Sequence, residues 1–224
     1  MKRHRMTLAG TALLAALFLV TMGAPSASAD IAQYSLTVGN TAISSFPGPY
    51  GTVDVNRTSA TMATITFTAD PGFKLGDSGP GQQGFGVNVN AGSWTVSGVL
   101  PATYTDSGAG ALDAEIGSFN QTFYHKGGFP VSVTTFSFNV TAVAGTNWTQ
   151  ASQVLVADSG GTRGNFAVAA HVFVCGQPAG TACTSATNTG SAGGTPSVPD
   201  GGMTLMLLGG ALVGLETLRR KFRV

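Results

Sequence analysis

Two acidic residues close together in the sequence, Asp113 and Glu115, are the nearest approach to a catalytic carboxylate pair. Glycoside hydrolases place two carboxyl groups beside the scissile bond, one as acid and the other as nucleophile or base. Whether two groups reach the separation that this chemistry needs depends on the fold. Because acidic residues are also common at solvated turns, a secreted hydrolase is the least favoured function for this chain.

A serine in a glycine-rich turn and a distant histidine offer a second constellation. Residues 76–80 (Gly-Asp-Ser-Gly-Pro) resemble the nucleophile loop of chymotrypsin-like proteases, and Ala-Ala-His at 169–171 resembles their histidine segment. That family has its His and Asp upstream of the Ser, whereas the only His upstream of Ser78 is His4. We therefore interpret residues 76–80 as a turn, predict no catalytic residues, and expect the protein not to be an enzyme.

Histidine and cysteine supply one candidate metal site, with His171, Cys175 and Cys183 as ligands and His125 as a fourth. Zinc sites with thiolate ligands usually contain Cys-x-x-Cys pairs, and this sequence has none. We therefore predict no metal and no cofactor, and a disulfide between Cys175 and Cys183 in an oxidising compartment. A calcium ion in an acidic loop stays open, although no loop has the ligand spacing of an EF-hand.

Aromatic rings bind sugars when several of them are exposed on one face of a sheet. Trp94 and Trp148 are the candidates for sugar binding, with Tyr50, Tyr104 and Tyr124 as further rings. Such a surface would make the protein a carbohydrate-binding module for a secreted polysaccharide. Packing in the core is the alternative for each ring, and we favour it.

The elements that must position these residues are strands. The chain is rich in Gly, with 32 residues, while only 9% of its residues are charged. Between the two ends Thr, Ser, Val and Phe are frequent and Leu, Glu and Lys are rare, which favours strands and turns over helices. Apolar residues alternate with small or polar ones at 85–89 and 136–140, as in strands with one buried and one wet face.

Turn signals rich in Gly, Pro and Asp separate about nine candidate strands. This pattern predicts an all-β fold, an antiparallel β-sandwich or jelly-roll-like domain over residues 30–183. Only residues 111–116 favour a short helical turn. The candidate strands are 34–38, 52–55, 62–68, 85–89, 94–99, 121–124, 136–140, 154–157 and 166–174.

The segment 184–197 contains mostly Ser, Thr, Gly and Ala. We interpret it as a flexible linker, because it has no obvious face to bury.

Charge argues against nucleic acid as a partner. Between residues 30 and 200 the only cations are Arg57, Lys74, Lys126 and Arg163, and they are outnumbered by carboxylates. A surface that holds a phosphate backbone needs the opposite balance.

The N-terminal segment is typical of an export signal. Residues 1–29 combine a basic start, an apolar run at 8–22, and small residues at Ala27 and Ala29. The run is shorter than the roughly 20 residues that span a bilayer. We therefore predict a signal peptide that signal peptidase removes after Ala29.

The C-terminal segment, residues 198–224, has three consecutive parts. A short motif is followed by an apolar run at 203–218, which we expect to form a short transmembrane helix of roughly 24 Å that enters the inner membrane transiently. Basic residues then hold the end of the chain on the cytoplasmic side. The motif is Val198, Pro199, Asp200, Gly201 and Gly202, and the basic residues are Arg219, Arg220, Lys221 and Arg223.

These three parts together resemble the PEP-CTERM sorting signal in its Val-Pro-Asp variant. Asp200 and Gly201 stand where the commonest form has Glu-Pro. The resemblance implies processing by an exosortase and delivery to the cell surface or to the exopolysaccharide matrix of a Gram-negative bacterium. The body is similar to uncharacterised proteins with the same tail, which assigns no activity. We therefore expect an exported, non-catalytic structural protein of a biofilm matrix or cell surface, with carbohydrate binding as the alternative.

Overall fold

The computed structural model describes residues 30–76, 82–143, 145–176 and 183–197. Our predictions for residues 1–29, for the motif and apolar helix at 198–218, and for the basic end lie outside these residues. Among the described residues, no helix is long and apolar enough to cross a membrane.

The described chain is built almost entirely of strands, which confirms the predicted all-β class. Two short 3₁₀ helices, η1 (Phe129–Val131) and η2 (Ala151–Gln153), interrupt them. The strands are β1 (Asp30–Gly39), β2 (Gly51–Arg57), β3 (Met62–Ala69), β4 (Phe73–Leu75), β5 (Phe85–Val87), β6 (Trp94–Leu100), β7 (Thr105–Asp113), β8 (Gly117–Tyr124), β9 (Thr135–Ala142), β10 (Val168–Cys175) and β11 (Ala186–Pro196).

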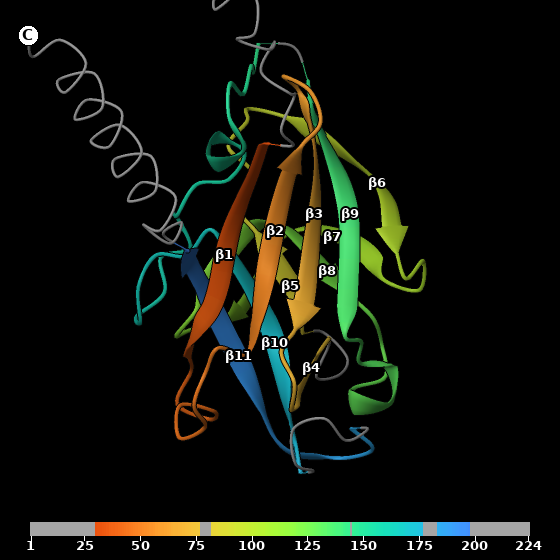
Figure 1. The fold of residues 1–224 in the computed structure, drawn as a ribbon, viewed down its shortest axis with the longest axis vertical. Helices are drawn as coiled ribbons and strands as arrows, with labels where there is room; N and C mark the ends of the chain where they lie inside the picture. Colours follow the sequence, from red (N-terminus) through yellow and green to blue (C-terminus); the bar gives the residue numbers. More distant parts are fainter. Residues whose placement is uncertain (1–29, 77–81, 144, 177–182, 198–224) are drawn as a thin grey trace, which may run out of the picture.

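All of these strands belong to one antiparallel sheet, in the order β6-β9-β3-β2-β1-β11-β10-β5-β8-β7, with β4 also paired to β10. The sheet curls until it is nearly closed. In Figure 1, β1, β2, β3 and β9 form the front layer, with β10, β5 and β8 behind it. The two layers of the predicted sandwich are therefore halves of one continuous sheet.

Aromatic rings fill the space between the two halves. Phe85 of β5 stacks on Phe136 of β9 with ring centroids 4.0 Å apart, and Phe67 of β3 meets Phe85 edge to face at 5.1 Å. Phe123 of β8 reaches Phe138 of β9 at 4.4 Å. Offset and edge-to-face pairs of this kind add to the free energy gained by burying the rings, so the front and back layers are locked together.

A smaller second core lies on the outer side of the back layer. Leu112, Ile116, Phe119, Phe166 and Ala169 pack together there. As a result every residue of β5 is buried, and so is all of β10 except its last residue. The expectation that the run at 85–89 has one wet face is therefore wrong, because the β7–β8 hairpin and Phe166 cover that face.

The predicted linker is also wrong, since most of it is β11, which lies between β1 and β10 in the interior of the sheet. Its glycines are what made the segment look unstructured. They provide room for neighbouring side chains: a Cβ on Gly193 would lie 2.5 Å from ring carbons of Phe166, and one on Gly194 would crowd Val168. The β domain thus extends beyond residue 183 to Pro196.

Three smaller predictions differ from the structure. Residues 154–157 form no strand, although Leu155 makes an isolated bridge with Val89. Residues 111–113 end strand β7, and the predicted helical turn is only a turn at 114–116. Residues 106–110 contain Asp and two Gly and so count among the turn signals expected between strands, but they lie inside β7.

We predict that Gly193→Ala destabilises the domain by about 1–3 kcal/mol, because an added methyl group overpacks against the buried Phe166 ring. Gly92→Ala is the matched control, since a Cβ there meets nothing within 4 Å, and it should change the free energy of unfolding by less than about 0.5 kcal/mol. Urea unfolding of residues 30–197 measures both. Equal stability of the two variants would contradict the interior position of β11.

Candidate functional site

The chain leaves the sheet at Ser197, one residue after the end of β11. The amide of Ser197 donates to the carbonyl oxygen of Gln33 on β1 at 2.8 Å. The hydroxyl groups of Ser197 and Ser35 form a second hydrogen bond of 2.8 Å. These contacts hold the last described residue against β1, so the position from which the C-terminal segment departs is defined by the fold.

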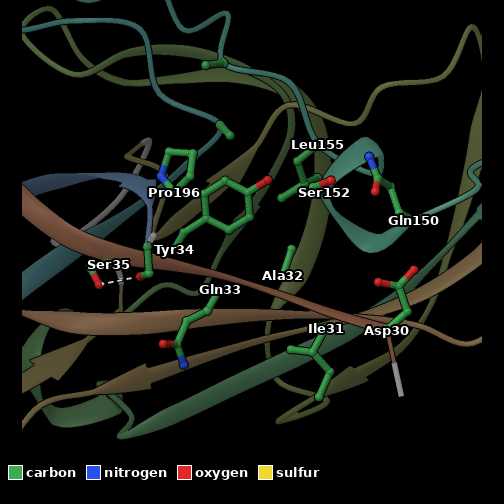
Figure 2. A pocket seen from close by; sticks show the side chains of 13 residues that line it. Asp30, Ile31, Ala32, Gln33, Tyr34, Ser35, Gln150, Ser152, Leu155 and Pro196 are labelled. Atoms are coloured by element: carbon green, nitrogen blue, oxygen red, sulfur yellow. Dashed lines mark hydrogen bonds between the residues drawn. The ribbon is translucent and has the colours of Figure 1, made fainter. Parts of the chain in front are cut away.

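A groove opens beside this departure point, with a volume of about 940 Å³. We call it the exit groove. In Figure 2 the ring of Tyr34 points into the groove, between Pro196 on one side and Ser152 and Leu155 on the other. Burial raises the pKa of the Tyr34 hydroxyl. The groove is lined by residues 30–35, Gln150, Ser152, Leu155, Ala157, Ala167, Pro196 and Ser197.

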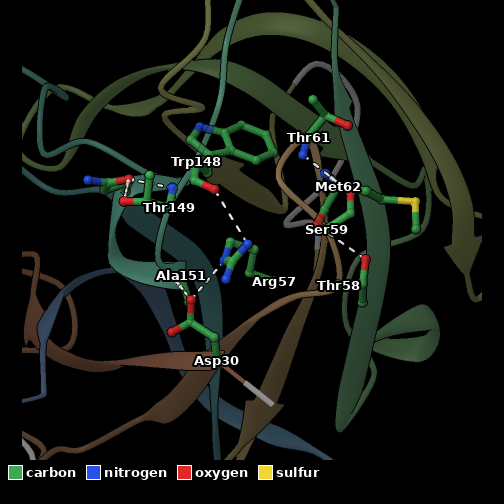
Figure 3. Close-up of polar contacts among 10 residues, drawn as sticks. Asp30, Arg57, Thr58, Ser59, Thr61, Met62, Trp148, Thr149 and Ala151 are labelled. Atoms are coloured by element: carbon green, nitrogen blue, oxygen red, sulfur yellow. Dashed lines mark hydrogen bonds and ion pairs between the residues drawn. The ribbon is translucent and has the colours of Figure 1, made fainter. Parts of the chain in front are cut away.

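A carboxylate organises the far end of the groove. Oδ2 of Asp30 accepts hydrogen bonds from Arg57 Nε and from the backbone amide of Ala151, both at 2.7 Å. Arg57 also donates to the carbonyl oxygen of Trp148 at 3.4 Å. Figure 3 shows Asp30 and Arg57 tying the start of β1 to the segment that contains Trp148 and Ala151. This contact could not be predicted from the sequence, because its residues are far apart along the chain.

The segment that follows Ser197 is the part of the chain that comparisons recognise. Residues 197–222 match the VPDSG-CTERM motif. The match identifies a PEP-CTERM-like exosortase sorting signal and confirms the predicted type of tail. Gly201 stands where the name of the motif has Ser. No curated protein and no solved structure matches the chain.

The sorting signal therefore follows the domain almost directly. It indicates an exported protein that transits the membrane and is processed by an exosortase-type system. Because β11 ends at Pro196, the signal begins where the sheet ends, and the exit groove lies at that boundary.

The two carboxylates considered for catalysis hold loops together. Asp113 Oδ1 accepts the backbone amides of Glu115 and Ile116 at 2.8 and 2.9 Å, and its Oδ2 accepts Asn40 Nδ2 at 3.1 Å. Glu115 Oε2 accepts from Arg163 Nε and from the amide of Thr41, the latter at 2.9 Å. The bond from Arg163 is the main reason that the pKa of Glu115 is lowered. A general acid needs a raised pKa, so Glu115 is poorly suited to that role.

His171 lies on the outer face of β10 and is buried. Its Nε2 is 2.5 Å from the hydroxyl oxygen of Thr189, which itself donates to the carbonyl of Val172 at 3.2 Å. The Thr189 hydroxyl and the His171 imidazole are therefore bonded to each other within the fold. Burial lowers the pKa of His171 to about 4, although nearby Asp113 opposes the shift. Ser78, the other member of the protease-like constellation, lies outside the described residues.

The two tryptophans proposed for sugar binding have structural roles. Trp148 is only 2% exposed, and its indole donates to the carbonyl oxygen of Asn90 at 3.0 Å, so it packs in the core, the alternative we favoured, and offers no ring face to a sugar. Trp94 is half-buried at the start of β6 and donates to Gln121 on β8 at 3.0 Å. Gln121 in turn donates to Asp106 of β7 at 2.7 Å, so Trp94 helps to join the two edges of the sheet.

Cys175 and Cys183 form a disulfide with Cα atoms 5.4 Å apart. It links the end of β10 to the residues that precede β11. Across the described ranges, no group of three or more His, Cys, Asp or Glu side chains gathers as a metal site would require.

We predict that Asp30→Ala lowers the free energy of unfolding by roughly 1–2 kcal/mol, because the Ala151 amide and Arg57 both lose their acceptor. Asp158→Ala removes an exposed carboxylate and is the control, with an expected change below about 0.5 kcal/mol. Urea unfolding of residues 30–197 at neutral pH checks both. A loss no larger than that of the control would show that the Asp30 contacts contribute little.

The buried His171 predicts a dependence of stability on pH. The unfolded chain takes up a proton at this residue below about pH 6.5, while the folded protein resists protonation until about pH 4. The free energy of unfolding should therefore fall as the pH falls through this window, by about 2–3 kcal/mol between pH 7.5 and 4.5. His171→Gln should remove this part of the slope in urea unfolding. An unchanged slope would assign the pH dependence to other groups.

Proposed function

We propose that the protein is a non-catalytic structural component of the bacterial cell surface or of its exopolysaccharide matrix. One observation carries the proposal: the exosortase-type sorting signal at 197–222 directly follows the last strand of a closed-up β domain. Removal of the tail beyond Ser197 would leave every strand of that domain in place. The cargo delivered by sorting is then the complete curled sheet.

The hydrogen bonds and burial of the candidate catalytic side chains support a role without catalysis. Asp113 and Glu115 are occupied by loop contacts, and His171 is buried and neutral at physiological pH. A catalytic group has to reach a substrate with a proton or a lone pair available. The carboxylate of Glu115 and the imidazole of His171 serve the fold instead.

The outer face of the front layer also supports a structural role. Cross-strand rows of hydroxyl and amide side chains run over β2, β3 and β9, and Thr64 Oγ1 donates to Asn139 Oδ1 at 2.7 Å within one of them. Apart from the carboxylate of Asp54, the side chains in these rows are uncharged, and none of them is aromatic. The rows are Thr52-Thr68-Thr135, Asp54-Thr66-Ser137 and Asn56-Thr64-Asn139.

We expect that replacing Val198, Pro199 and Asp200 with alanine keeps the full-length chain in the membrane fraction, because the processing enzyme no longer recognises it. Wild-type protein should reach the surface or matrix fraction without the sorting tail. Asp158→Ala, an exposed change outside the motif, should behave as wild type. Cell fractionation with mass spectrometry of the released protein measures the outcome. Release of the alanine variant at the wild-type rate would contradict exosortase-type sorting.

A second experiment separates the structural role from its rivals. Purified surface fractions should retain the protein equally well for wild type, Trp94→Ala, Asp113→Asn and Glu115→Gln, and none should degrade the secreted polysaccharide. Polysaccharide pull-down and release of reducing sugar are the measurements. Retention that is lost in Trp94→Ala would replace the structural role with carbohydrate binding. Sugar release that is lost in the Asp113 or Glu115 variant would replace it with hydrolysis.

A further inference from the structure

Large apolar side chains on the surface are concentrated toward one end of the curled sheet. In the part of the chain that the structure describes, five of them are exposed: Ile31, Met62, Leu100, Val143 and Val156. Scattered single residues of this kind are normal on soluble proteins, whereas a group of neighbours marks an interaction surface. The positions of these residues in the sheet decide which case applies.

Three of the five lie at adjoining strand ends. Ile31 is the second residue of β1, and it is opposite Asn56 near the end of β2. Met62 is the first residue of β3 and is opposite Thr141, while Val143 follows the end of β9. In Figure 1 these ends lie together at the top of the front layer. We call Ile31, Met62 and Val143 the exit rim. Their exposed fractions are 56%, 39% and 47%.

The sorting tail departs near Ile31, the member of the exit rim that lies on β1. Ser197 is bonded to Gln33, two residues along β1 from Ile31. Only Val198 to Gly202 separate Ser197 from the apolar run that begins at Met203. Even fully extended, the six residue steps from Ser197 to Met203 reach at most about 21 Å. While the apolar run is in the membrane, the rim is therefore held close to the lipid surface.

Several polar groups around the rim are paired within the protein. Asp30 and Arg57 form an ion pair, so together they add no net charge. In the β2–β3 hairpin, Ser59 Oγ accepts the amides of Thr61 and Met62 at 3.2 and 3.0 Å, and Thr58 Oγ1 donates to the carbonyl of Met62 (Figure 3). Buried polar groups are costly only when they lack partners. These paired groups approach an apolar phase at a lower cost than unpaired groups would.

We propose that the exit rim rests on the surface of the lipid bilayer and orients the β domain until the tail is removed. The bilayer is favoured as the partner because the short connection to Met203 brings it to the rim without any other protein. Apolar side chains that enter the interface gain free energy in proportion to the area they bury. The proposal rests on the sorting tail and not on the structural role of the delivered domain.

Native tryptophan fluorescence tests the proposal, since Trp94 and Trp148 both lie toward this end of the β domain. Full-length protein is reconstituted into vesicles of phosphatidylethanolamine and phosphatidylglycerol, with or without brominated acyl chains as quenchers. We expect the brominated lipids to quench the wild-type fluorescence. Combined Ile31→Ser, Met62→Ser and Val143→Ser should reduce the quenching at least twofold.

Leu100→Ser is the matched control, because Leu100 is 61% exposed at the opposite end of β6, and it should quench as wild type does. Circular dichroism melting verifies that each variant is folded, and Ile31→Ser alone replaces the triple variant if that variant is not. Equal quenching in the rim variant and wild type overturns the proposal. Quenching that appears only when the vesicles contain the processing enzyme also overturns it, and assigns the rim to a protein contact.

Normal surface sorting of the rim variant combined with reduced quenching would leave the proposed function intact. Conversely, a protein that docks on vesicles but never reaches the surface would contradict that function alone. The two proposals can therefore fail separately.

Discussion

The structure depends on the insertion of β11 between β1 and β10. In the pairing order of the sheet, the six strands β6, β9, β3, β2, β1 and β11 are joined to the remaining strands by the backbone hydrogen bonds between β11 and β10. Those bonds need residues without side chains at Gly193 and Gly194, because Phe166, Val168 and Leu36 already occupy the space beside them. Small residues are therefore required where the two halves of the sheet meet. Once the halves are joined there, the stacked rings of Phe85 and Phe136 fill the interior between them.

The same arrangement explains why many polar side chains of the domain form hydrogen bonds between loops and distant strands. A curled sheet leaves loops at both ends that must be tied to distant strands. Asp30 ties the start of β1 to Ala151, Asp113 and Glu115 tie the β7–β8 hairpin to the loop after β1, and Trp94 ties β6 to β8. Few charged residues are available, and those at these junctions bond to backbone amides or to one another. These polar side chains therefore stabilise the fold.

Much of the fold was readable from local patterns, because alternation at 136–140 and at 62–68 reflects strands with one buried face. Where burial comes from both sides, alternation is a poorer guide. It located β5 but wrongly indicated a wet face, and β10 could be located only as an apolar run. Strand β11 was missed because its glycines have no side chains from which to infer a buried face. The tail was recognisable because its three parts act locally, whereas Arg57 and Ala151 gather around Asp30 only through the topology.

The position of β11 at the very end of the domain has a consequence for biogenesis. A chain that crosses a membrane with its N-terminus first delivers this strand after all the others, immediately ahead of the sorting signal. Until it arrives, β1 and β10 each lack a neighbour, and the aromatic interior cannot be sealed. The sheet can therefore close only after nearly the whole chain up to the sorting signal has been delivered. Closure of the sheet and delivery of the sorting signal therefore fall at nearly the same stage of export.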